Sequence, residues 1–193
     1  MERAGEVIQA CTTDFVAQCY ELYQTPSLGT LVRTGELPVY GIVYRAETTS
    51  IEPGRRPIAR GKDEASEEDI YRTSPQLMRL MRSEFSVIAV GYRQGAQLYR
   101  YLPPQPVQVH AFVYISPPEE VKEFAASFDF LPLLLNNSRI PVDSGELTAA
   151  ALRAMSRVQD DPHAFLVAAG KELTQLLRGD YVRLRTVLGR LKE

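Results

Sequence analysis

Four basic side chains lie within eight residues of this 193-residue chain, in a segment that directly follows Gly54 and includes Gly61. They are Arg55, Arg56, Arg60 and Lys62. Guanidinium groups beside flexible glycines can hold a phosphate, a nucleic-acid backbone or the acidic surface of a partner protein. Four acidic residues follow shortly, namely Glu64, Glu67, Glu68 and Asp69. The other interpretation is therefore a solvated or subunit-facing loop whose charge these carboxylates neutralise.

The same segment superficially resembles a phosphate-binding Walker A loop. That motif has four residues between its glycines and a Ser or Thr directly after its lysine, to hold magnesium. Here six residues separate Gly54 from Gly61, and Asp63 follows Lys62. We therefore reject a nucleotide cradle in this loop and expect no nucleotide cofactor.

The other reactive residue types lack partners at a useful spacing. His110 and His163 have no Cys, His or acidic residues at metal-ligand spacing, so we expect core or cap histidines. Cys11 and Cys19 fall on neighbouring predicted strands, where we expect both to be buried and inert. No nucleophile elbow and no dinucleotide fingerprint occurs. We predict no catalytic residue, no metal site and no cofactor, and therefore no enzyme.

Short apolar segments separated by turn residues predict six β-strands in the N-terminal part of the chain. These segments are residues 7–11, 15–19, 28–32, 39–46, 85–92 and 97–102. The run from Val87 to Val90 is continuously apolar, which predicts a strand buried on both faces. Six short strands with little helix between them indicate a small antiparallel barrel.

Helical signals interrupt and follow these strands. Ser66 and Asp69 have capping-box spacing, which predicts a helical insertion over about residues 64–82. Later in the chain, Asp143 and Asp161 are the expected N-caps of two helices with apolar stripes.

Three prolines within residues 102–106 predict a domain boundary, because they force a stiff, extended segment. The predicted fold class is therefore α+β. We expect a six-stranded barrel with its helical insertion over residues 1–106, followed by a linking strand and a helical subdomain over residues 107–193.

The N-terminal residues resemble the HAS barrel, a six-stranded domain shared by HerA-type DNA-translocating ATPases and rotary ATP synthase subunits. The resemblance covers about residues 1–115. It rests on Gly5-Glu-Val7, Gly41-Ile-Val-Tyr44, residues 47–61 and the proline-rich exit before Val109-His-Ala-Phe-Val113. In that family the barrels pack side by side and hold ring subunits together, while the ATPase chemistry lies in a following domain. This chain has no P-loop, and the residues after 115 are too few for a RecA-like core, so the resemblance implies assembly without ATP hydrolysis.

The charge and the apolar runs of the sequence indicate which classes of partner to expect. With 22 Lys+Arg against 24 Asp+Glu, the formal net charge of −2 gives no strong overall attraction to nucleic acid or anionic lipid. No apolar run approaches the roughly 20 residues that a membrane span requires. No signal-peptide pattern opens the sequence, so we expect a cytoplasmic protein with no membrane partner.

These observations favour a protein-interaction or assembly module that associates with itself or acts as an adaptor to a separately encoded ATPase. The expected contact groups are the bases of the loop and three tyrosines on the barrel rim, namely Tyr40, Tyr44 and Tyr92. The alternative is a small nucleic-acid-binding barrel that uses the Arg-rich loop 54–62 and exposed tyrosines.

Overall fold

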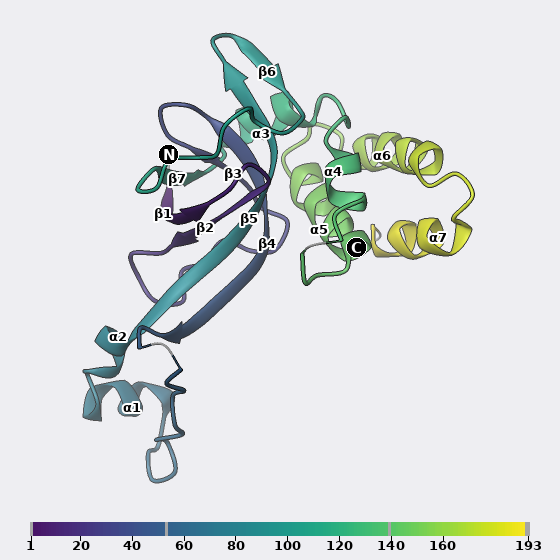
Figure 1. Ribbon diagram of the computed structural model, residues 1–193. Helices are drawn as coiled ribbons and strands as arrows, with labels where there is room; N and C mark the ends of the chain where they lie inside the picture. Colours follow the sequence, from purple (N-terminus) through teal and green to yellow (C-terminus); the bar gives the residue numbers. More distant parts are fainter. Residues whose placement is uncertain (1, 53, 139, 192–193) are drawn as a thin grey trace.

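The computed structural model describes residues 2–52, 54–138 and 140–191. They form an antiparallel sheet and a group of helices, which confirms the α+β class (Figure 1). The strands are β1 (Arg3–Ala10), β2 (Asp14–Gln18), β3 (Leu31–Thr34), β4 (Val39–Ser50), β5 (Met81–Gln94), β6 (Gln97–Tyr99) and β7 (Phe112–Ile115).

The sheet closes in part into a ring. Its strand order is β2-β1-β7-β3-β4-β5-β6, and β2 also pairs with β5. The stretch expected at 97–102 does not supply the sixth strand of this ring. β2 occupies one edge of β5 at residues 84–88, so β6 pairs only with residues 92–94 farther along β5. β7 takes the sixth place instead, between β1 and β3.

β5 is buried on both faces, as its continuous apolar run predicts. Alternate side chains of a strand point to opposite faces, so they enter two different cores. Phe85, Val87 and Ala89 contribute to the inner core, which lies among the strands. Ile88 and Val90 contribute to the outer core, where the sheet meets the helices.

The helices that follow the sheet supply most of the outer core. They are α3 (Pro118–Ala125), α4 (Leu131–Leu135), α5 (Ser144–Ser156), α6 (Pro162–Leu176) and α7 (Tyr181–Arg190). The two predicted N-caps are confirmed. The Asp143 side chain accepts the Glu146 backbone N–H at 2.8 Å, and the Asp161 side chain accepts that of Ala164 at 2.9 Å.

β4 and β5 continue as a two-stranded ladder down to the pair Ser50–Met81. Beyond this pair the chain forms a projection of residues 51–80, here called the arm, which extends away from the sheet (Figure 1). The arm contains the short helices α1 (Glu67–Thr73) and α2 (Leu77–Leu80). The predicted cap of the insertion is confirmed, because the Ser66 hydroxyl accepts the Asp69 backbone N–H.

Candidate functional site

The arm carries the predicted basic loop and has no core of its own. None of its described residues, 51–52 and 54–80, is buried. Ile58 is 73% exposed, and Ile51 and Met78 are also exposed. One link to the rest of the chain is the pair of hydroxyls of Tyr23 and Tyr71, which lie 2.5 Å apart. A segment this exposed gains little stability from its own packing.

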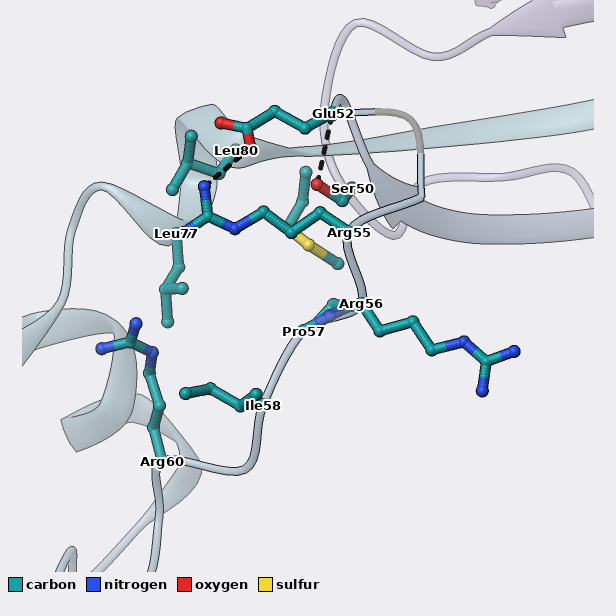
Figure 2. A pocket seen from close by; sticks show the side chains of 10 residues that line it. Ser50, Glu52, Arg55, Arg56, Pro57, Ile58, Arg60, Leu77 and Leu80 are labelled. Atoms are coloured by element: carbon teal, nitrogen blue, oxygen red, sulfur yellow. Dashed lines mark hydrogen bonds and ion pairs between the residues drawn. The ribbon is translucent and has the colours of Figure 1, made fainter.

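A cavity of about 150 Å³ lies at the base of the arm. Its apolar lining is Pro57, Ile58, Leu77, Leu80 and Met81, its basic lining is Arg55, Arg56 and Arg60, and Ser50 and Glu52 complete it. Figure 2 shows Ile58 directed toward Leu77, with the Arg55 and Arg60 side chains extending on either side of that gap. Arg56 points away from it. The cavity therefore combines an apolar floor with cationic groups at its margin.

The guanidinium groups differ in how they are paired. Arg55 donates to the Glu52 carboxylate at 2.7 Å, and this partner raises the pKa of the Arg55 guanidinium. Arg56, Arg60 and Lys62 make no ion pair within the part of the chain that the structure describes. They are exposed and free to meet an external anionic group.

The carboxylates downstream of the loop do not neutralise these bases by direct pairing. Asp69 pairs with Arg72 and Glu64 accepts the Thr73 hydroxyl, so both are engaged within the arm. Across the arm, six basic residues balance six acidic ones. The bases lie mainly at residues 55–62 and the acids mainly at 63–69. The arm is therefore neutral overall, with its two charge signs segregated along the chain.

Of the three tyrosines expected on the rim, one is buried and two are half-buried. Tyr40 is 1% exposed and sits in the outer core, so it cannot contact a partner. Tyr44 is half-buried against the same core, and burial raises the pKa of its hydroxyl. Tyr92 is half-buried and stacks on Tyr99 with ring centroids 4.9 Å apart. The structure does not bring these tyrosines to the basic loop.

The expectation that His110 and His163 are core or cap histidines needs a correction. The His110 side chain is exposed, with its Nδ1 2.5 Å from a Glu6 carboxylate oxygen, and it lies in neither core. This contact is the main reason why the pKa of Glu6 is lowered. His163 is also exposed, in the first turn of α6. A positive φ of 70° turns the backbone at His110, and the alternating pattern of residues 107–113 does not reveal such a turn.

The two cysteines are free and differ in exposure. Cys19 is buried as expected, whereas Cys11 is exposed because it directly follows β1 and lies outside the inner core. Among the described residues, no group of three or more His, Cys, Asp or Glu side chains is placed to hold a metal ion.

A larger hollow of about 410 Å³ lies beside the start of β1, with Arg3, Cys19, Tyr20 and Glu21 among its lining residues. Burial raises the pKa of the Cys19 thiol to about 11, so the sulfur offers no thiolate there at neutral pH. The arm cavity differs in having walls that are mainly apolar.

Sequence reasoning found the bases of the loop but missed the apolar lining of the cavity. Leu77, Leu80 and Met81 were predicted only as part of a helical insertion. One signal was present: the two predicted helical turns are too short to bury their own apolar residues.

No family model and no curated protein matches this chain. In the described part of the chain, no helix combines the length and the apolar character needed to cross a bilayer.

Proposed function

We propose that this chain is a non-enzymatic protein-interaction module that binds a partner protein through the arm. The observation that carries the proposal is the complete absence of buried residues among the described positions of the arm. Exposed apolar side chains such as Ile58 and Met78 are unfavourable in water, and a partner that covers them recovers that free energy. The cationic margin of the cavity would then set the orientation of the partner.

The resemblance to HAS barrels supplies the class of partner. We interpret the partly closed ring of β1, β2, β5, β4, β3 and β7 as a HAS-like barrel. On that interpretation the chain associates with itself or acts as an adaptor to a separately encoded ATPase. The free, exposed thiol of Cys11 suits a reducing compartment, and we place the protein in the cytoplasm.

Nucleic-acid binding by the loop is the second candidate, because Arg56, Arg60 and Lys62 have no ion-pair partner among the described residues. The charge of the arm favours a protein instead. Six carboxylates share the arm with six bases, and they would repel a phosphate backbone laid along it. A protein surface with mixed charge meets no such repulsion.

A matched pair of surface variants tests the proposed function. Ile58→Asp puts a charge into the cavity, and Val182→Asp changes an equally apolar residue, 81% exposed, on α7. Each tagged chain replaces the native copy in its natural host, is cross-linked mildly and is purified, and the cross-linked proteins are quantified. We expect Ile58→Asp to lose its cross-linked partner and Val182→Asp to keep it.

Equal retention by the two variants would contradict the proposal. Retained material that disappears on nuclease treatment would favour the nucleic-acid alternative. That alternative makes its own prediction: retention on DNA or RNA at low salt that falls steeply as salt rises and is lost in the double variant Arg55→Glu, Arg56→Glu.

A further inference from the structure

A second exposed feature complements the arm cavity. The turn between β3 and β4 presents Leu37, which is 77% exposed, directly after the carboxylate of Glu36. Glu36 makes no ion pair with any residue that the structure describes. The turn thus displays an apolar side chain beside a free negative charge. This is the chemical complement of a mainly apolar cavity that has at its margin one base, Arg60, without an ion-pair partner among the described residues.

The turn is held in one shape by a buried hydroxyl. Thr34, which is buried, donates its Oγ1 hydrogen to the Leu37 carbonyl at 2.9 Å. The same oxygen accepts the Val39 backbone N–H at 3.0 Å, and Pro38 restricts the backbone between them. A side chain displayed on a fixed turn loses little conformational freedom when it binds.

The size of the cavity fits such a side chain. An apolar cavity of about 150 Å³ takes a guest of about the size of benzene, which is also the size class of a leucine side chain. Arg60 lies at the margin of the cavity without an ion-pair partner among the described residues, so it can meet the carboxylate that accompanies the leucine.

The turn and the cavity of one molecule cannot meet. The turn directly precedes Val39 and the arm directly follows Ser50, so they flank opposite ends of β4. A strand of this length separates them by roughly 40 Å. An occupant with the chemistry of this turn must therefore come from another molecule.

We propose that copies of this chain join head to tail, with Leu37 of one copy in the arm cavity of the next and Glu36 against Arg60. This proposal rests on the proposed function, because it takes the arm as the docking surface and names a second copy as its occupant. The contact uses two different surfaces, so it repeats from copy to copy. It closes into a ring if the rotation allows and otherwise extends as an open filament.

Two variants, each defective in one half of the junction, test this proposal. Leu37→Asp removes the inserted side chain, and the double variant Ile58→Asp, Arg60→Glu blocks the cavity. Masses are measured by light scattering on a sizing column, at chain concentrations up to about 1 mM, where small interfaces become populated. Circular dichroism spectra equal to that of the unmodified chain confirm that each variant is folded.

We expect the unmodified chain to exceed its 21.7 kDa monomer mass increasingly with concentration, and each variant alone to stay at 21.7 kDa. A 1:1 mixture of the variants contains one intact junction, formed by the turn of the cavity variant and the cavity of the turn variant. That mixture should give a dimer of twice the chain mass and nothing larger.

A monomeric unmodified chain, an assembly that either variant leaves intact, or a mixture of folded variants that stays monomeric would each overturn the head-to-tail junction. If the junction fails while Ile58→Asp still loses its cross-linked partner, the arm binds a different protein and the proposed function stands. If Ile58→Asp also keeps its partner, both proposals fail.

Discussion

Cys19 and Cys11 illustrate how position within one sheet sets the chemistry of a residue. Cys19 is 6% exposed in the inner core, and burial raises the pKa of its thiol to about 11, because the thiolate is poorly solvated there. Cys11 lies outside that core and is exposed. Since the thiolate is the reactive form, the two thiols should differ in reactivity.

We predict that one of the two thiols of the native chain reacts rapidly with a chromogenic disulfide reagent at about pH 8. Both should react once the chain is unfolded in urea. The variant Cys11→Ser should show no rapid reaction in the native state. Two rapid reactions in the native unmodified chain would contradict the burial of Cys19.

Gly41 allows β4 and β5 to approach closely. A Cβ atom built at this position would lie 2.3 Å from Val87 Cγ1 and 2.8 Å from the Ile88 carbonyl oxygen. Gly41→Ala should therefore lower the free energy of unfolding by about 1–3 kcal/mol, measured by urea denaturation. The control is Gly189→Ala in α7, where a Cβ meets no atom within 4 Å. Helix propensity predicts a gain there of up to about 1 kcal/mol, and equal effects at the two sites would be inconsistent with the close approach.

At the scale of elements, Asp143 connects the start of α5 to the end of α7. Its carboxylate accepts the Glu146 backbone N–H at 2.8 Å and an Arg190 guanidinium hydrogen at 2.7 Å. The backbone hydrogen bond is the main reason that its pKa is lowered, and Arg190 adds to the effect. One side chain therefore caps one helix and holds another.

Asp143→Ala should lower the free energy of unfolding by about 1 kcal/mol at neutral pH, because the cap is lost. Asp143→Asn should lower the free energy of unfolding by less than Asp143→Ala does, because the Asn amide oxygen still caps the helix. It loses only the contribution of the charge that faces Arg190. Urea denaturation checks both values. If Asp143→Asn lowers the free energy of unfolding as much as Asp143→Ala does, then Asp143 stabilises the fold through its charge and not through the cap.

The charge of Asp143 also predicts a pH dependence. Its pKa is lower in the folded chain than in the unfolded chain, so its stabilising contribution is fully present above the unfolded value. That contribution disappears as the pH falls through the folded value. The difference in unfolding free energy between the unmodified chain and Asp143→Asn should therefore shrink when the pH is taken well below the ordinary carboxyl value of 3.8. A difference that stays constant would contradict the assignment.

At the scale of the whole molecule, the outer core joins the sheet to the helices. Phe124 of α3 is fully buried, with its ring centroid 5.4 Å from that of Tyr40 on β4 and 5.2 Å from that of Phe130. Arg100 donates to the backbone oxygens of Glu123 and Phe124, which ties α3 to the segment after β6. The helices and the sheet thus share one set of buried contacts.

We predict that Phe124→Ala lowers the free energy of unfolding by about 3–5 kcal/mol, and that the helices and the sheet still unfold together. Far-ultraviolet circular dichroism reports the helices and near-ultraviolet circular dichroism reports the packed tyrosines. The two signals should give coincident transitions. Tyr181→Ala, at an exposed position on α7, should change stability by less than about 0.5 kcal/mol. Separate helix and sheet transitions in the unmodified chain would contradict a shared core.

Part of the candidate site was predictable from sequence. The bases of the loop were found because glycine and proline around them exclude regular structure and so favour exposure. The cavity they border was not found, because Ile58 meets Leu77 and Leu80 only when the two ends of the arm fold back together. Likewise, no local pattern shows that Leu37 and the cavity have complementary chemistry.

By itself, the sequence determined the features that depend on neighbouring residues: the α+β class, the caps at Ser66, Asp143 and Asp161, and the burial of β5 on both faces. Only the tertiary structure decided which strand takes the sixth place in the ring, and that Tyr40 faces the helices while His110 faces Glu6 and the solvent. The physical reason is the separation, along the sequence, of the residues that make each contact. Capping and strand formation are set by contacts a few residues apart, whereas strand partners and burial depend on contacts such as that of Glu6 with His110, 104 residues away.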